Sequence, residues 1–476
     1  MENVKYISVA AITFMTFNSI WGFDNIVNGY AMQGLPVIIR WLFIFTCYFV
    51  PYALIVGELG TTFKNSPGGV SSWIKQLIGP KTAFLAGWTF WAIHIPYLAQ
   101  KTLSIVVAGS WAVFQDDKII QSIPTIYLQT LNLLIFLIAL WLSSKGMRIL
   151  EKLGTIAGTS VLVMSILFII LALSAPMITD AQTETIIYTW NNFVPKFDFE
   201  ILTTVTFLVF SVGGCENLSP YINNMRNPAR EYPRAMIYVI IMISVSAILG
   251  SFAMGFMFDS NNIPKDLMMN GPYYCFQKLG EYYHIGSTFL IIYAITNMIS
   301  KIAVLCIFID APIKMFLADT DKKLIPPRLA KVNKDGIPIN GYWLTAFLAS
   351  ILILLPALGI GDVNELFNMM MKLIAVAIPC TSLWVFVAYM ALKRSHKITV
   401  DQSAYKFTSN RTVGFLIGLF CFCYTIYACF IGMFPVGPEK FSSEWIFELT
   451  LNILTPVLLT ALGFVAMKIA EYRNSN

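Results

Sequence analysis

Two short stretches of the sequence resemble each other and decide the fold: WGFDN at residues 21–25 and GGCEN at residues 213–217. Each contains glycine, one variable residue, an acidic residue and asparagine, and each lies in the middle of a long apolar segment. Glycine weakens a helix by about 1 kcal/mol, and Asp and Asn side chains compete with the helix for local hydrogen bonds. We therefore expect two helices that are broken at their midpoints.

The composition around these motifs is that of an integral membrane protein. Of the 476 residues, 57% are hydrophobic and 12% are charged, whereas soluble domains are roughly 45–50% apolar and about 25% charged. So few charges cannot cover a water-facing surface. The composition excludes a soluble enzyme, a disordered chain and a nucleic-acid-binding protein. It predicts an all-α membrane protein whose partner is the lipid bilayer.

Apolar runs between turns and charges predict twelve transmembrane helices. No soluble domain fits between them, so residues 1–476 form a single transmembrane domain. The rough cores of the spans are 6–31, 37–60, 82–113, 125–143, 153–175, 201–222, 235–257, 285–316, 341–358, 365–391, 412–434 and 446–470.

The positions of Lys and Arg predict the orientation. With the N-terminus inside, the inner segments hold 23 of the 32 Lys and Arg residues and the outer loops hold 6. Lys101, Lys301 and Lys372 lie within spans. Such an excess of inner positive charge predicts that both termini are cytoplasmic.

The two motifs also predict an internal repeat. Five spans separate the start of the helix with Asp24 from the start of the helix with Glu216, so the second copy enters the membrane from the opposite side. This is the pattern of an inverted repeat, spans 1–5 (residues 6–175) against spans 6–10 (residues 201–391). Spans 11 and 12 (residues 412–470) are appended to it.

Several further motifs resemble those of the amino acid–polyamine–organocation (APC) superfamily. They are FSVGGCE at 210–216, NP at 227–228, PRA at 233–235, GEL at 57–59 with PGGV at 67–70, LAD at 317–319, PPRL at 326–329 and GIP at 336–338. Within the superfamily the chain most resembles the bacterial glutamate:γ-aminobutyrate antiporter group. The resemblance covers most of the chain. It implies a LeuT-like fold with helices 1 and 6 broken, a re-entrant segment after span 2, and exchange of amino acids or their amines by alternating access in the bacterial cytoplasmic membrane.

One stretch departs from the family pattern. Many members carry a small Gly-Ser-Gly-type stretch where span 1 unwinds, and its N–H groups hold the substrate carboxylate. Here the stretch is Gly22-Phe23-Asp24, which is bulkier and anionic. An aspartate repels a carboxylate and attracts an ammonium group, so the departure favours at least one cationic or decarboxylated substrate.

Charged residues inside the membrane are candidate functional residues. Each costs at least about 2.5–3.5 kcal/mol at the bilayer centre, so it needs a partner, a cavity or a function. Asp24 and Glu216 stand at the two predicted breaks. The alternative is that they stabilise the breaks without touching a ligand. Glu216 also occupies the position of a family acid that is linked to protons or gating.

Lys301 is the most informative base, because it lies in the middle of span 8. In sodium-coupled relatives, this helix and span 1 form a sodium site. A lysine ammonium there replaces the ion and makes transport sodium-independent. The overlapping alternative is a simple salt bridge with Asp24 or another acid.

Other polar residues are expected to be structural. We expect Glu58 to end or cap a helix, His94 to be buried and hydrogen-bonded instead of sensing pH, and Asp310 with Lys314 to form a helical ion pair. We assign no function to Glu365 and Lys372.

Aromatic residues beside the breaks fit a gated path, because cations bind to aromatic faces. Trp21 precedes the first break, and Phe210 has the position of a family aromatic that closes over substrate. Trp88, Trp91 and Tyr97 are expected to pack unless they face the same cavity. The predicted substrate-binding residues are Trp21, Gly22, Phe23, Asp24, Asn25, Phe210, Gly213, Gly214 and Glu216, and the predicted coupling or ion-replacing residues are Lys301 and Glu216.

Three classes of membrane protein are considered as explanations of these features: a channel, an enzyme and a secondary transporter. A channel needs a selectivity filter, and no TVGYG-like segment occurs. An enzyme needs a motif such as HExxH or GxSxG, and neither occurs; the eight Cys residues form no metal-binding or disulfide pattern. We therefore expect a secondary transporter without cofactor or metal that exchanges amino acids or their decarboxylated amines, without sodium. Proton-coupled uptake of a neutral amino acid is the alternative. No feature predicts an oligomeric state.

Overall fold

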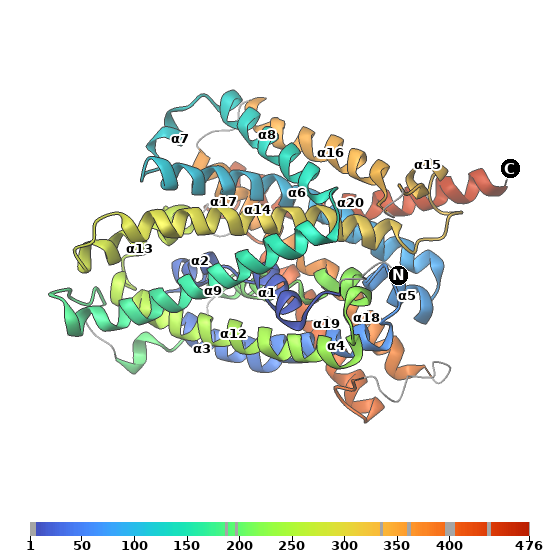
Figure 1. The fold of residues 1–476 in the computed structure, drawn as a ribbon, viewed down its shortest axis with the longest axis horizontal. Helices are drawn as coiled ribbons and strands as arrows, with labels where there is room; N and C mark the ends of the chain where they lie inside the picture. The colour runs from blue at the N-terminus through green and yellow to red at the C-terminus, as the bar shows by residue number, and fades with distance from the viewer. Residues whose placement is uncertain are drawn as a thin grey trace.

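The computed structural model describes residues 6–185, 189–195, 199–333, 337–358, 363–395, 405–435 and 439–475. Long helices run along the longest axis of one bundle, with α7 and α13 toward one end and α5 and α15 toward the other (Figure 1). The β-structure of the described residues is limited to an isolated bridge between Ile7 and Met225. The prediction of an all-α protein is confirmed.

Helices coincide with each of the twelve predicted spans. In the order of those spans, they are α1 (Val9–Ile20) with α2 (Phe23–Gln33), α3 (Val37–Ile44) with the π-helix η1 (Phe45–Phe49) and α4 (Val50–Thr62), α6 (Pro80–Val113), α8 (Thr125–Ser143), α9 (Met147–Ile178), α10 (Phe199–Thr203) with α11 (Val205–Ser211) and the 3₁₀-helix η3 (Cys215–Asn224), α12 (Pro228–Met257), α14 (Thr288–Leu317), α16 (Ile339–Leu354) with η4 (Leu355–Leu358), α17 (Val363–Ala377) with α18 (Pro379–Arg394), α19 (Arg411–Gly432) and α20 (Ser443–Ser475). The remaining helices are α5 (Val70–Leu77), α7 (Lys118–Ser122), η2 (Trp190–Asn192), α13 (Leu267–Tyr282) and α15 (Pro327–Ala330).

Nine helices of the described residues are long and apolar enough to cross a membrane. The broken helices α1–α2 and α10–η3 are not among the nine, because each of their pieces is too short. The 34-residue α6 is also not among them. Polar residues such as His94, Gln100 and Lys101 lie along its length and lower its mean hydropathy.

Both predicted helix breaks are present. The chain leaves the helix at Trp21 and Gly22, which are extended, and re-enters it at Phe23. The Asn25 side chain donates to the Ile20 carbonyl over 3.1 Å, so the motif itself satisfies a backbone oxygen that the break releases.

The second break has a left-handed glycine at its centre. Gly214 has φ +100° and precedes the 3₁₀-helix η3. A Cβ at this position would lie 2.5 Å from the Asn217 side-chain nitrogen. The backbone conformation and this close approach both explain the glycine.

Loops predicted on one side of the membrane contact one another. At the predicted inner end, the contacts are Ile7 with Asn224 (2.9 Å), Lys75 with Asp319 (2.7 Å) and Arg473 with Ile325 (3.4 Å). At the predicted outer end, they are Leu35 with Ser260 (3.1 Å) and Lys278 with Glu184 (3.0 Å). The contacts of Ile7 and Arg473 place both ends of the described chain at the same end of the bundle.

The helical features that were not predicted include the helix α13 and a division of predicted span 10. The α13 helix lies in the loop between α12 and α14, where Asn270, Gly271 and Pro272 interrupt the apolar pattern that identifies a helix. Predicted span 10 is divided into α17 and α18 at Pro379, whose ring nitrogen cannot donate to the helix. The short helix α5 lies at the place of the expected re-entrant segment. Gly336 and His396 lie outside the described residues, as does the side chain of Glu365.

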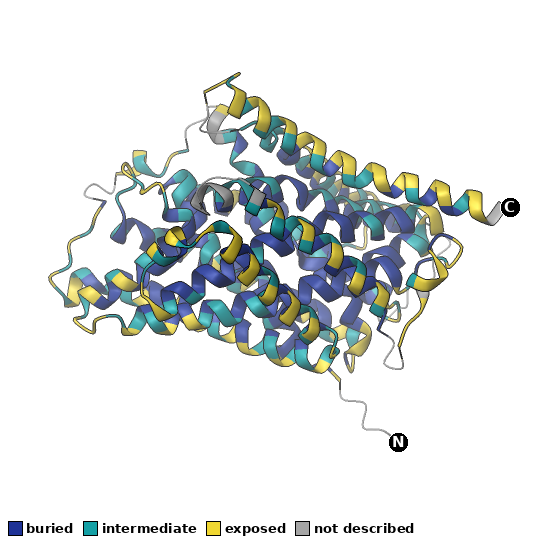
Figure 2. Cartoon of the chain, turned by 90° about the horizontal axis from the view of Figure 1, so that it is seen from above, coloured by how far each residue is buried: buried dark blue, intermediate teal, exposed yellow. Residues whose placement is uncertain are grey.

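Exposed residues lie on the outer surface of the bundle around a buried interior (Figure 2). On α9 the apolar residues Ile156, Val163 and Ile170 are 57%, 55% and 59% exposed. Their seven-residue spacing places them on one face of the helix. A stripe of exposed apolar side chains fits contact with lipid and agrees with a multi-pass membrane protein.

Candidate functional site

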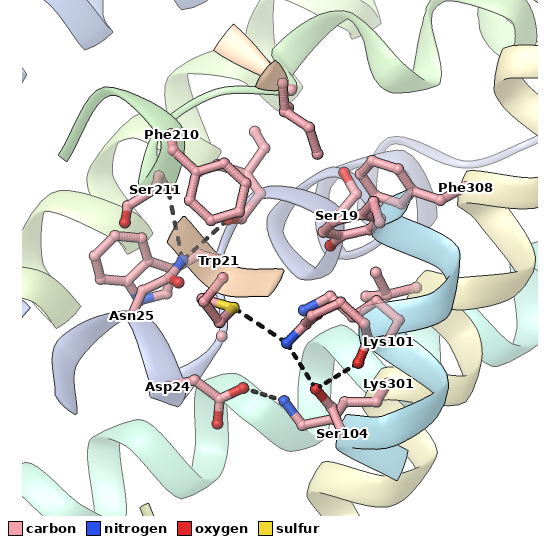
Figure 3. Close-up of a pocket in the computed structure, with 18 of the residues that line it drawn as sticks. Ser19, Trp21, Asp24, Asn25, Lys101, Ser104, Phe210, Ser211, Lys301 and Phe308 are labelled. Carbon is pink, nitrogen blue, oxygen red and sulfur yellow. Dashed lines mark hydrogen bonds and ion pairs between the residues drawn. The ribbon is translucent and has the colours of Figure 1, made fainter. Parts of the chain in front are cut away.

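The two helix breaks meet at a central cavity together with α6 and α14 (Figure 3). It contains about 80 Å³ of space, which is room for several water molecules at roughly 10–15 Å³ each. The predicted site residues that line it are Trp21, Gly22, Asp24, Asn25, Phe210, Gly213, Gly214, Glu216 and Lys301. Residues from opposite halves of the predicted repeat thus lie around one space.

Phe23 is the predicted site residue that does not line this cavity. Its ring contacts those of Phe168, Phe276 and Tyr293, with centroids 4.7, 5.2 and 5.4 Å away. As the first residue of α2, it points its side chain toward α9, α13 and α14. The bulk of Phe23 therefore fills the core and does not obstruct the site.

Asp24 is held by three side chains of α14. Lys301 forms an ion pair with it, and Tyr293 and Asn297 donate to Asp24 Oδ1 over 3.3 and 3.4 Å. The first turn of α2, where Asp24 lies, also stabilises a negative charge. The predicted salt bridge is present. Because the charge of Asp24 is compensated, it does not by itself favour a cationic substrate.

Glu216 anchors the second break to two other helices. Tyr52 of α4 donates to its carboxylate, and Ser382 of α18 donates over 3.3 Å. The Gly214 N–H in turn donates to the Tyr52 hydroxyl over 3.2 Å. These contacts fit stabilisation of the break, while the position of Glu216 at the cavity leaves it available to a ligand.

Lys101 is a cavity residue that our interpretation of the sequence missed. Its ammonium lies 5.0 Å from the centroid of the Tyr97 ring. Among the described residues it has no ion-pair or hydrogen-bond partner. The signal was present in the sequence as an intramembrane base, but one sequence does not show which helix face borders a cavity.

Five buried residues around the cavity carry a polar side-chain atom that has no hydrogen-bond partner among the described residues. These atoms are Trp21 Nε1, Asn28 Oδ1, His94 Nε2, Gln100 Oε1 and Ser211 Oγ. Buried polar groups in proteins are nearly always hydrogen-bonded. The cavity therefore provides both donors and acceptors to a polar ligand or to water.

The aromatic residues divide into two groups. Trp21, Tyr97 and the half-buried Phe210 line the cavity. Trp88 and Trp91 do not line it but pack against Phe316, with centroids 5.5 and 5.3 Å away.

The structural roles expected for His94 and for Asp310 with Lys314 are confirmed, whereas Glu58 does not end a helix but lies within α4 and forms a buried ion pair. His94 is buried and its Nδ1 lies 2.6 Å from the Phe90 carbonyl. Glu58 pairs with Lys393 over 2.6 Å, and Asp310 pairs with Lys314 over 2.7 Å.

Within the described part of the chain, no group of His, Cys, Asp and Glu residues could hold a metal ion. The ionisable residues of the cavity bind one another or remain available to a solute.

Comparison with known proteins agrees with this geometry. An amino acid permease family model matches residues 7–458. The aspartate/glutamate permease AcaP of Lactococcus lactis subsp. cremoris is 44% identical over 472 residues, which are 98% of this chain and 96% of that protein.

Two antiporters are more distant relatives. The glutamate/gamma-aminobutyrate antiporter of Lactococcus lactis subsp. lactis is 25% identical over 437 residues, or 90% of this chain and 83% of that protein. A probable agmatine/putrescine antiporter of the same subspecies is 25% identical over 225 residues, or 47% of this chain and 46% of that protein. The resemblance to the APC superfamily is confirmed. With a broken-helix cavity at its centre and a family match along nearly its whole length, the chain belongs to the amino acid permease family of the APC superfamily.

Proposed function

We propose that the chain is a secondary active transporter that exchanges amino acids, or the amines formed from them by decarboxylation, across the bacterial cytoplasmic membrane. The observation that carries this proposal is the central cavity, where two broken helices meet two acidic side chains (Asp24 and Glu216) and two lysines (Lys101 and Lys301). Broken helices supply unpaired N–H and carbonyl groups at membrane depth, and these bind the two charged groups of an amino acid.

The proposed architecture is twelve transmembrane helices with a LeuT-like inverted repeat. Residues 6–175 and 201–391 form the two halves, and residues 412–470 form the two additional helices. Two observations support it: the breaks fall at matching motifs in the two halves, and loops on alternate sides of the predicted spans gather at opposite ends of the bundle. Alternating access then exposes the cavity to each side in turn, with both termini in the cytoplasm.

We further propose that transport needs no sodium. The Lys301 ammonium pairs with Asp24 between α14 and α2. A fixed positive charge at this position repels a cation and satisfies the carboxylate that would otherwise bind one. Lys301 thus holds the two helices together in place of an ion.

Proton-coupled uptake of a neutral amino acid remains a second candidate function. The observation in its favour is Glu216, a carboxyl group that is only 1% exposed and that lines the cavity. A buried acid that gains and loses a proton during the cycle couples transport to a proton gradient.

Counterflow in proteoliposomes tests the proposed function. Vesicles are loaded with aspartate, glutamate, glutamine, asparagine, γ-aminobutyrate, agmatine or putrescine, and uptake of each radiolabelled compound is measured. We expect uptake to be stimulated by at least one internal amino acid or amine. If uptake depends on a pH gradient and is not stimulated by internal substrate, the result supports the proton-coupled alternative. No uptake of any of these compounds by correctly folded protein overturns both.

A further inference from the structure

We propose that Lys101 determines substrate specificity by binding the side-chain carboxylate of an acidic amino acid. This inference rests on the proposed function, because it assigns a substrate class to the same cavity. It concerns a lysine that, among the described residues, contacts an aromatic ring and has no ion-pair or hydrogen-bond partner.

The first argument is that Lys101 has no ion-pair or hydrogen-bond partner among the described residues, since the Asp24 carboxylate that attracts it is paired with Lys301. A charged group inside a membrane costs at least about 2.5–3.5 kcal/mol, whereas a cation–π contact such as that with Tyr97 contributes roughly 0.5–2 kcal/mol. Other lysines of the bundle interior have carboxylate partners: Lys301 pairs with Asp24, and Lys393 pairs with Glu58. A carboxylate on the substrate would give Lys101 the partner that the protein does not supply.

The second argument is that the other Asp, Glu and Lys side chains of the cavity already have ion-pair or hydrogen-bond partners. Asp24 accepts from three residues of α14, and Glu216 accepts from Tyr52 and Ser382. Among the four Asp, Glu and Lys side chains of the cavity, Lys101 is therefore the cation that is not already paired with a carboxylate. An aspartate or glutamate molecule, with two carboxylates and one ammonium group, supplies an additional negative charge, whereas a neutral or cationic amino acid does not.

The third argument concerns the face of α6 on which Lys101 lies. His94, Tyr97, Lys101 and Ser104 are spaced three or four residues apart, so they share one helix face, and all four line the cavity. Beside them, Gln100 Oε1 and His94 Nε2 have no partner among the described residues. The Nδ1 of His94 donates to Phe90, which leaves Nε2 as an acceptor. These acceptors suit an ammonium group bound next to Lys101.

The fourth argument separates the two carboxylates of such a substrate. The helix breaks offer backbone N–H groups, which suit the α-carboxylate in this architecture. Lys101 lies on a different helix and remains for the carboxylate of the side chain. γ-Aminobutyrate keeps this carboxylate and is expected to use Lys101, whereas agmatine and putrescine lack it.

The test compares acidic substrates with their amides on the same variants. Glutamate and glutamine, and aspartate and asparagine, differ mainly in the charge of the side chain. A charge-assisted hydrogen bond is strong enough that Lys101→Gln should weaken glutamate and aspartate affinity by about ten- to a hundredfold, and glutamine and asparagine affinity by less than about threefold. Lys101→Arg keeps the charge and should keep the preference for acidic substrates.

Lys145→Gln is the matched control. The Lys145 ammonium also lies over an aromatic ring, 4.7 Å from the centroid of Trp141, but it does not line the cavity. This variant should have wild-type affinities. If Lys101→Gln does not fold, the proposal is tested on the wild type and on Lys101→Arg. For each protein, the thermal stabilisation by glutamate is compared with that by glutamine.

Three results separate the two proposals. Equal losses for glutamate and glutamine in Lys101→Gln overturn a role in side-chain recognition. A wild-type protein that exchanges neutral or cationic compounds in preference to acidic ones overturns this inference and leaves the proposed function intact. A folded wild-type protein that transports none of the compounds overturns the proposed function itself.

Discussion

The Lys301 ammonium donates to the Asp24 carboxylate and so joins the middle of α14 to the first turn of α2, directly after the helix break. Asp24 and Lys301 come from opposite halves of the proposed repeat, and their side chains are only 22% and 9% exposed. The pair is therefore both a structural link and part of the wall of the cavity.

The first prediction tests this link. Asp24→Asn and Lys301→Met each leave one charge without its partner, and breaking a buried pair typically costs about 3–5 kcal/mol. Each single variant should lower the melting temperature in detergent, and the double variant should recover most of the loss. A double variant as unstable as the worse single variant would show that the two charges act independently. If Asp24 also binds an ammonium group directly, the double variant should lose more affinity for amines than for their parent amino acids.

The second prediction concerns sodium. Because Lys301 already neutralises Asp24, replacing external Na⁺ with choline should leave the flux into proteoliposomes unchanged. The measurement is the initial rate of uptake over a series of sodium concentrations at constant ionic strength. A rate that rises and saturates with sodium would contradict the ion-replacing role.

The third prediction compares two neighbouring phenylalanines of α11. Phe210 is half-buried and lines the cavity, whereas Phe207 is 1% exposed and does not line it. Phe210→Ala should weaken substrate affinity or uncouple exchange while the protein stays folded. Phe207→Ala should destabilise the protein by about 3–5 kcal/mol, as is usual for core Phe→Ala substitutions. Melting temperature and substrate affinity are measured on both variants; normal affinity with lost stability in Phe210→Ala would assign Phe210 to the core.

The fourth prediction concerns the ion pair between Glu58 and Lys393, which joins α4 to α18. Both side chains are buried, and the Glu58 carboxylate also accepts from Tyr389 and from the Phe407 N–H. Glu58→Gln should lower stability by a few kcal/mol and leave substrate affinity unchanged. Asp319→Asn is the control, because its pair with Lys75 is partly exposed and such pairs contribute about 0–1 kcal/mol. Similar losses of melting temperature in the two variants would contradict the greater contribution to stability that we assign to the buried pair.

The fifth prediction concerns the crossing of α1 and α9 at Gly158. A Cβ at Gly158 would lie 2.1 Å from the Phe14 carbonyl oxygen, and a backbone atom cannot move aside easily. Gly158→Ala should therefore separate the two helices, with a clear loss of stability and of transport. Gly109→Ala is the matched control, because the nearest atom to its new Cβ is Met298 Sδ at 3.8 Å. Equal stability of the two variants would rule out a close crossing.

The sequence predicted the local features well because they depend on short-range chemistry. Apolar length predicts where each helix lies, and the glycine and Asx residues of WGFDN and GGCEN predict where two helices break. The distribution of Lys and Arg predicted which loops gather at each end. The helix α13 was missed because its apolar pattern is interrupted and it is too short for a membrane span.

What only the tertiary structure decided is which polar side chains meet. The sequence places Asp24, Glu216 and Lys301 within spans, but their partners lie on helices that are distant in the chain: Tyr52 and Ser382 for Glu216, and Tyr293, Asn297 and Lys301 for Asp24. The same holds for Phe23, which faces the core, and for Lys101, which faces the cavity. Helix formation follows from residues three or four apart, whereas the pairing of charges follows from how the helices rotate and cross, and that rotation is set by side-chain packing over the whole bundle.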